Sequence, residues 1–97
     1  MKEVYIRLDE GSQLDLVLNH LYFFKEITNM EAFERYGITR LSGRIFDLRE
    51  KGVGIVTDYR EKKGKSGRYG VYKLEDEQTI HTIYNDIRHT ARTMVQE

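Results

Sequence analysis

The sequence contains no cysteine and no long apolar run, and its formal net charge at pH 7 is zero. Without cysteine, the chain has neither a disulfide framework nor a cysteine-based zinc site. No apolar segment approaches the roughly 20 residues that span a bilayer, and the N-terminal MKEVYIRLDEG carries charges where a signal peptide would be apolar. A length of 97 residues suits one domain, residues 1–97, with a modest core. We therefore expect a cytoplasmic protein with no membrane partner.

The charges are unevenly distributed although they sum to zero. Between Arg35 and Lys73 the sequence has eleven Lys or Arg and four Asp or Glu, whereas the remainder has five basic and twelve acidic residues. Such segregation is typical of a protein with one electropositive face. The balanced total argues against a nucleic-acid partner, but the distribution favours one.

The first third of the chain has the pattern of one strand and two helices. KEVYIRL, residues 2–8, alternates apolar side chains with Tyr and Arg, which is the period of a half-buried strand. Ser12 has the character of an N-cap and apolar residues follow at helical spacing, which predicts a helix over 13–24. Thr28 and Glu31 predict the start of a second helix over 29–35. Gly37 fits its end, because glycine readily adopts the left-handed conformation of a C-cap.

A third helix is predicted over residues 39–51, with Thr39 as its N-cap and Gly52 at its end. Its apolar stripe consists of Leu41, Ile45 and Leu48. The following segment has strand patterns on both sides of a basic, glycine-rich tip near 61–67, which predicts a hairpin.

Residues 75–97 are predicted to form a long C-terminal helix, because acidic residues stand at its start and arginines come late. Apolar residues recur along it at helical spacing. This face packs either on its own chain or against a second copy in a two-fold dimer, and we lean toward the dimer. The dimerisation residues would be Ile80, Ile83, Tyr84, Ile87, Ala91 and Met94.

The order of these elements predicts an α+β fold, a winged helix-turn-helix with a three-helix core and a β-hairpin wing over residues 12–74. An N-terminal strand and the C-terminal helix would extend it. In such a fold the third helix presents its outer face to the major groove. The small and basic residues on that side are candidates for DNA contact: Thr39, Arg40, Ser42, Gly43, Arg44 and Asp47.

Two features of this helix bear on the prediction. Gly43 costs about 1 kcal/mol relative to Ala within a helix, which close approach of another backbone or a phosphate would justify. The alternative to DNA contact is a structural role for the arginines, since Arg44 and Arg49 have acidic residues nearby with which to form ion pairs, including Asp47 and Glu50.

The wing offers five further candidates for phosphate contact, Arg60, Lys62, Lys63, Lys65 and Arg68. Its alternative is a solvated loop whose lysines block edge pairing.

Three segments of the chain resemble a known family. YGITRL at 36–41, the I-x-D-L-R pattern at 45–49 and RYGVYKL at 68–74 are similar to motifs of the small helix-turn-helix domain common in bacteriophages and prophages. The resemblance covers roughly residues 14–74. It implies a winged helix-turn-helix that binds DNA in a bacterial or phage-infected cell. It implies no particular target, and the two ends of the chain lie outside it.

Several other motifs are set aside. GKS at 64–66 lacks the glycine that a phosphate-binding loop has five positions earlier, because Tyr59 stands there. His20, His81 and His89 have no metal-ligand spacing, and no serine or threonine belongs to a triad pattern. We therefore expect no enzyme, no metal and no cofactor. Double-stranded DNA is the expected partner, for a transcriptional regulator or an architectural, excisionase-like factor. The alternative is a module that binds a protein instead of DNA, such as a phage inhibitor of a host factor.

Overall fold

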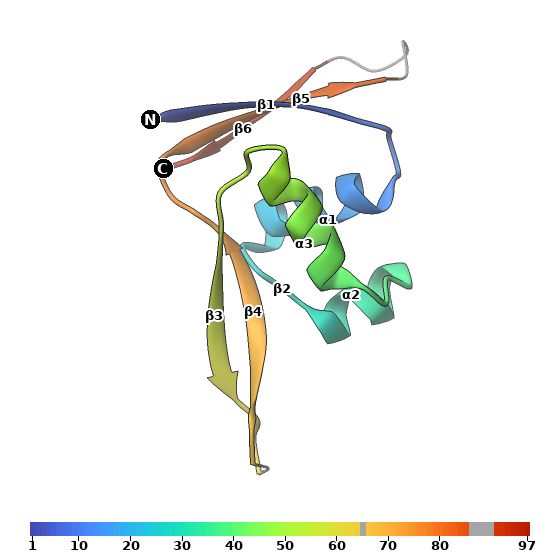
Figure 1. Cartoon of the computed structure of the whole chain (residues 1–97), viewed down its shortest axis with the longest axis vertical. Coiled ribbons are helices and arrows are strands. Elements are labelled where there is room, and N and C mark those ends of the chain that lie inside the picture. Colours follow the sequence, from blue (N-terminus) through green and yellow to red (C-terminus); the bar gives the residue numbers. More distant parts are fainter. Residues whose placement is uncertain (65, 86–90) are drawn as a thin grey trace.

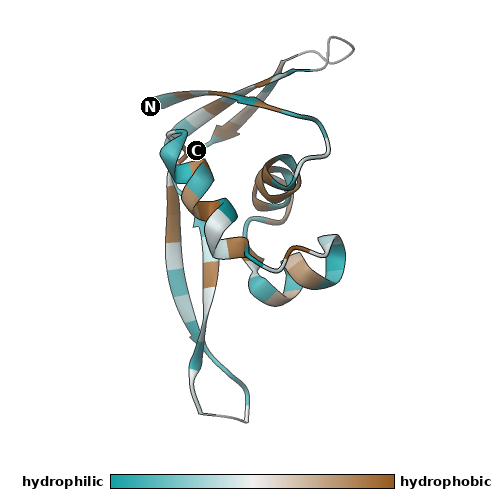
Figure 2. Ribbon diagram, turned by 45° about the vertical axis from the view of Figure 1, so that its right-hand side comes forward, coloured by the Kyte–Doolittle hydropathy of each residue, from teal (hydrophilic) through white to brown (hydrophobic). Residues whose placement is uncertain are grey.

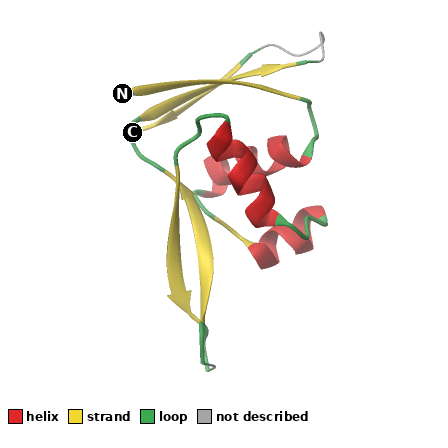
Figure 3. Cartoon of the chain, viewed as in Figure 1, coloured by secondary structure: helices red, strands yellow, loops and turns green. Residues whose placement is uncertain are grey.

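The computed structural model describes residues 1–64, 66–85 and 91–97. In this part of the chain three helices pack against two three-stranded sheets, one above them and one at their side in Figures 1 and 3. No helix of the described residues has the length and apolar character to cross a membrane. The elements are β1 (Lys2–Leu8), α1 (Gln13–Phe24), β2 (Ile27–Thr28), α2 (Asn29–Tyr36), α3 (Leu41–Glu50), β3 (Ile55–Glu61), β4 (Arg68–Leu74), β5 (Gln78–Tyr84) and β6 (Arg92–Gln96).

The starts of α1 and α2 confirm the predicted caps. The Ser12 hydroxyl accepts a hydrogen bond from the Asp15 backbone N–H at 3.3 Å. Thr28 and Glu31 form a reciprocal capping box, which satisfies donors that the first turn of a helix leaves free. Gly37 ends α2 with φ of 68°, and its N–H donates to the Phe33 carbonyl at 2.9 Å. A short turn therefore connects α2 to α3, as a helix-turn-helix requires.

The predicted start of α3 is wrong by a small shift. The helix begins at Leu41 with Arg40 as N-cap, and no side chain caps it. The carbonyl of Arg40 accepts the N–H groups of Gly43 at 3.1 Å and Arg44 at 3.3 Å. Because Arg40, one residue after Thr39, is the N-cap, the Thr39 hydroxyl has no capping role and its side chain lies exposed in the turn.

Strands β2, β4 and β3 form the wing sheet, in that order and antiparallel. The hairpin of β3 and β4 pairs from Ile55 opposite Leu74 to Glu61 opposite Arg68, so the tip falls within the predicted 61–67 region. Its distal half extends away from the helices in Figure 1 and is largely teal and white in the hydropathy colouring of Figure 2. The predicted hairpin wing is confirmed.

The predicted C-terminal helix is wrong, because the segment forms strands β5 and β6. Strand β5 pairs parallel to β1 and antiparallel to β6, so that both ends of the chain build one terminal sheet of order β1-β5-β6. Ile80 lies opposite Met94 in this ladder, and both side chains are buried at 0% and 1% exposure. A side chain inside the core is not available to a second copy, which removes the helical dimer seam.

The other residues predicted to form the dimer interface do not lie on one common surface. Ile83 lies on the outer face of the terminal sheet at 38% exposure, and Ala91 is exposed before β6. Tyr84 is half-buried and donates its hydroxyl to Asp15 of α1 at 2.8 Å. Ile87 lies outside the described residues.

The terminal sheet closes the core instead of adding a separate layer. Its inward residues Val4, Ile80 and Met94 belong to the same apolar cluster as Leu18 of α1 and Ile45 of α3. The alternation predicted for 2–8 is confirmed, since residues 4, 6 and 8 are buried and 5 and 7 are exposed. One buried apolar cluster therefore joins the terminal sheet to the helices.

Two polar contacts fix the terminal sheet to its neighbours. Buried Gln78 donates to the Gly54 carbonyl at 2.8 Å and accepts from the Gly54 N–H at 3.0 Å. The carboxylate of Asp15 accepts from Tyr84, from the Gly11 N–H and from the Asn19 amide. These bonds satisfy buried polar groups, as close packing demands.

Candidate nucleic-acid interface

The outward side of α3 is the side that its apolar stripe leaves at the surface. Leu41, Ile45 and Leu48 are at most 1% exposed, which turns the opposite side of the helix to solvent. Ser42 and Phe46 are exposed on that side. The helix therefore presents a surface instead of being enclosed by the fold, as a groove-reading helix must.

Gly43 leaves an opening on this surface. A Cβ built on Gly43 would meet nothing within 4 Å, so packing inside the chain does not require glycine there. Glycine still costs about 1 kcal/mol relative to Ala in a helix. The open space gives an external backbone or phosphate access to the start of α3, which is the approach that the sequence predicted.

Thr39 and Arg40 lie in the turn before α3, and both are exposed. Among the residues that the structure describes, Arg40 makes no ion pair, so its guanidinium is available to a ligand. Arginine donates in a fork that suits guanine or phosphate oxygens.

Arg44 and Asp47 pair with each other on one flank of the helix. Nη2 of Arg44 lies 3.2 Å from Oδ2 of Asp47, and their side chains are 37% and 40% exposed. An exposed pair of this kind contributes only about 0–1 kcal/mol. A phosphate can therefore compete for Arg44 at low cost, although its charge is partly balanced in the free protein.

Arg49 has a structural role on the other flank of α3. Its Nε and Nη2 atoms donate to the Ile55 carbonyl at 3.1 and 2.7 Å, and Nη2 also donates to the Thr57 hydroxyl at 3.0 Å. Its acceptors are therefore a backbone carbonyl and a hydroxyl, and not the carboxylates of Asp47 or Glu50 that the sequence made available. Arg49 instead holds the base of β3 against α3, which sets the position of the wing relative to the helix.

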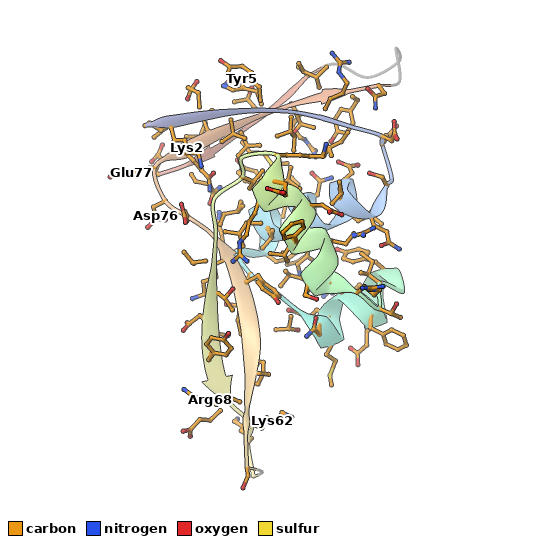
Figure 4. The ribbon with its side chains drawn as sticks, viewed as in Figure 1. Lys2, Tyr5, Lys62, Arg68, Asp76 and Glu77 are labelled. Atoms are coloured by element: carbon orange, nitrogen blue, oxygen red, sulfur yellow. The ribbon has the colours of Figure 1, made fainter. Side chains whose placement is uncertain are left out.

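The far end of the wing carries side chains of positive charge. Lys62, Lys63 and Arg68 are exposed, and none forms an ion pair with another described residue. Figure 4 shows Lys62 and Arg68 together near the far end of the hairpin, well away from the helices. Lys65 lies outside the described residues.

Arg60 differs from the other basic residues of the wing. Its guanidinium binds the Glu26 carboxylate through two hydrogen bonds of 2.7 and 2.8 Å. These hydrogen bonds lower the pKa of Glu26 and raise that of Arg60. Arg60 thus ties the wing to the segment before β2. The sequence could not reveal this partner, because Glu26 stands 34 residues earlier.

Phe46 lies on this surface but was not among the residues predicted to contact DNA. It lies among the outward residues of α3 at 60% exposure. The helical period already placed it opposite the apolar stripe, which is the signal that could have found it. An exposed aromatic ring here can make apolar contact with the methyl group of thymine.

Comparison with known proteins identifies a family for most of the chain. A family model described as a winged helix-turn-helix domain matches residues 12–77. No curated protein and no solved structure gives a significant match. The matched segment runs from the N-cap of α1 through the wing and stops just before β5.

Proposed function

This chain belongs to the winged helix-turn-helix domain family, and we propose that it binds double-stranded DNA with α3 in the major groove. The observation that carries the proposal is the open outward side of α3. It combines the uncrowded Gly43 with Arg40, which has no ion-pair partner among the described residues. The exposed cations of the wing tip then neutralise phosphates beside the groove.

The contacts divide by role. Arg40, Ser42 and Phe46 are the base-reading candidates, since two can donate hydrogen bonds to base edges and the third can cover a thymine methyl. Thr39, Arg44 and Asp47 border them, with Asp47 holding Arg44 until a phosphate replaces it. Lys62, Lys63 and Arg68, with Lys65 expected beside them, position the protein on the backbone and read no sequence.

The biological output is a second part of the proposal. Binding of this kind regulates transcription by blocking or recruiting polymerase, or bends DNA for a recombinase as small excisionases do. Both outputs use the same contacts with DNA. We expect the protein to act in the cytoplasm of a bacterial or phage-infected cell.

The test is a titration of labelled duplex DNA with purified protein at about 50 and 200 mM salt. Wild type should bind at low salt and lose affinity by orders of magnitude at the higher concentration. Arg40→Ala/Arg44→Ala should abolish or strongly weaken binding. Lys2→Ala/Lys25→Ala removes the same charge outside the proposed interface and should bind nearly as wild type does. Absence of wild-type binding at low salt would refute the proposal.

Gly43 gives a variant with opposite effects on stability and binding. Gly43→Ala should raise the free energy of unfolding by up to about 1 kcal/mol, because it improves helix propensity where space is open. It should weaken DNA binding, because the added methyl group stands where the ligand approaches. A more stable variant that binds DNA as wild type does would show that this part of α3 is not in close contact with the duplex.

A protein partner is the second candidate function, favoured by exposed apolar side chains away from the wing. Phe23, Met30 and Phe33 are 59%, 70% and 59% exposed at the end of α1 and on α2. Exposed apolar groups of this size are typical of protein-binding surfaces when they are contiguous. Phe33→Ser should abolish capture of such a partner and leave DNA binding unchanged, whereas Arg40→Ala should do the reverse.

A further inference from the structure

A hollow of about 440 Å³ lies beside α3 and shares Arg44 with the candidate interface on that helix. It is lined by the end of β1, the first turn of α1 and one flank of α3. Three cationic side chains from separate parts of the chain meet there, Arg7, Arg44 and Lys51. We call it the basic hollow. Its volume exceeds what a single phosphate group occupies.

The charges that line the basic hollow are not balanced within it. Arg7 and Lys51 are exposed and form no ion pair with another described residue. The one acidic residue of the lining is Asp9, whose carboxylate accepts a hydrogen bond from the Asn85 amide at 2.7 Å. Arg7 and Lys51, together with Arg44, whose charge Asp47 partly balances, thus face one carboxylate that already has a donor. An anion entering the hollow would meet a net positive field.

The position of the basic hollow relative to α3 defines its ligand. At 3.6 residues per turn, one flank of α3 and its two caps carries Arg40, Arg44 and Lys51, and the opposite flank carries Arg49. Arg49 is the residue that holds the wing through the Ile55 carbonyl. The hollow and the wing therefore lie on opposite flanks of the same helix.

This arrangement matches the two sides of a major groove. A helix in the groove, which is about 12 Å wide, has a phosphate backbone on each side. The cations of the wing would face the phosphate backbone on one side of the groove. Arg40, Arg44 and Lys51, with Arg7 beside them, would face the backbone on the other side. The first turn of α1 adds the positive end of its helix dipole to the lining.

We infer that the basic hollow binds a phosphodiester of the duplex strand that lies across the groove from the wing. The inference rests on the proposed DNA binding and adds a site to it. It gives the terminal sheet a part in recognition, because Arg7 belongs to β1, outside the residues that the family model matches. Arg7 and Lys51 are then backbone-positioning residues and read no bases.

The experiment compares Arg7→Gln/Lys51→Gln with Lys2→Gln/Lys25→Gln on a labelled duplex between about 50 and 200 mM salt. The control pair removes equal charge away from the hollow, since Lys2 starts β1 and Lys25 follows the end of α1. Lys2 and the far end of the wing are well separated in Figure 4. All four side chains are exposed, so melting temperatures should stay at the wild-type value.

Each phosphate that the protein neutralises adds about 0.9 to the slope of log affinity against log salt. Loss of this one phosphodiester contact should make the decline in affinity about 3.5-fold smaller than that of wild type over this fourfold range of salt. The control pair should keep the wild-type slope. If wild type binds DNA and both double variants keep its slope, the basic hollow takes no phosphate and the inference fails, while the proposed function stands.

A second measurement separates duplex phosphate from a free anion. Inorganic phosphate and poly-glutamate are titrated into the wild-type protein while the amide signals of Leu8 and Gln13 are followed by NMR. Weak phosphate binding that Arg7→Gln/Lys51→Gln abolishes, together with the flattened DNA slope, supports the inference. Tight binding of phosphate or poly-glutamate with an unchanged DNA slope would assign the hollow to a free anion or an acidic protein segment and overturn it. If wild type binds no DNA, the proposed function and the inference both fail.

Discussion

The terminal sheet and the wing sheet have equal numbers of strands in the described part of the chain, but only the wing sheet has a part that extends beyond the core. Every strand of the terminal sheet places apolar side chains inside, such as Val4, Ile80 and Met94. The wing buries Ile55 and Leu74 at its base, but its distal part exposes Tyr59 and Arg68. One sheet is held by burial, and the far part of the other mainly by its backbone ladder. Stability and ligand contact should therefore respond to different substitutions.

The largest expected effect lies inside the terminal sheet. Ile80→Ala should lower the free energy of unfolding by about 2–5 kcal/mol, because it removes a fully buried side chain and leaves a cavity. Ile83→Ala makes the same chemical change on the outer face of the same strand and should cost less than about 1 kcal/mol. Urea unfolding of both variants measures the difference, and Ile80→Val keeps the test usable if Ile80→Ala does not fold. Equal costs at the two positions would contradict the inward and outward assignment.

The next effect concerns the bond between β5 and α1. Tyr84→Phe should cost about 1–3 kcal/mol, toward the lower end because Asp15 keeps two other donors. Burial, together with this hydrogen bond, raises the pKa of Tyr84, so the hydroxyl is a donor at neutral pH. Tyr5→Phe, on the outer face at 66% exposure, should change stability by less than about 0.5 kcal/mol. A negligible loss for Tyr84→Phe would mean that the bond adds nothing to the attachment of the sheet.

The wing should show the opposite behaviour. Lys62→Gln/Lys63→Gln should leave unfolding within about 0.5 kcal/mol of wild type and flatten the salt dependence of DNA binding for every sequence tested. The slope should fall by about 0.9 for each phosphate that the variant no longer neutralises. Anisotropy titrations on two unrelated duplexes measure this effect. A weakening confined to one duplex would assign the lysines to base reading.

A smaller, pH-dependent effect arises at the contact between α1 and α2. Burial lowers the pKa of His20 from its ordinary value of 6.5, outweighing the opposing influence of Glu31, while Arg35 also lowers it. Its Nδ1 lies 2.7 Å from the Tyr36 hydroxyl. The unfolded chain therefore takes up a proton near pH 6.5 and the folded chain only at lower pH, so the stability is complete above 6.5 and declines as the pH falls below it. Unfolding between about pH 7.5 and 5.5 should show this decline in wild type and a weaker one in His20→Gln. Parallel curves for the two proteins would remove His20 as the cause.

Local signals were sufficient for the middle of the chain. Thr28 with Glu31 and Gly37 mark helix boundaries through contacts within a few residues. The stripe of Leu41, Ile45 and Leu48 follows one helical face, so its burial could be predicted from spacing alone. The hairpin likewise needs only its own two strands. These elements were predicted because their causes lie close together in the sequence.

The C-terminal segment was mispredicted because its spacing fits two structures. Ile80, Ile83 and Met94 suit a helix, but the buried residues Gln78, Ile80 and Thr82 also recur at every second position, which is the period of a strand. The partner that decides between them is β1, more than 70 residues away. The role of Arg60 was hidden for the same reason, since Glu26 is distant in sequence. DNA contact by the candidate residues stays a prediction until binding is measured.

The parallel pairing of β1 with β5 also has a consequence during protein synthesis. Because Lys2 pairs with Gln78, about 76 further residues must be synthesised after Lys2 before β1 can pair with β5. At about 5–20 residues per second, that delay lasts several seconds. Throughout it the apolar side of β1, with Val4, Ile6 and Leu8, has no sheet to join. The helices can form while the ribosome is still translating, but the core closes only when the last strands emerge, and until then the nascent chain is exposed to aggregation.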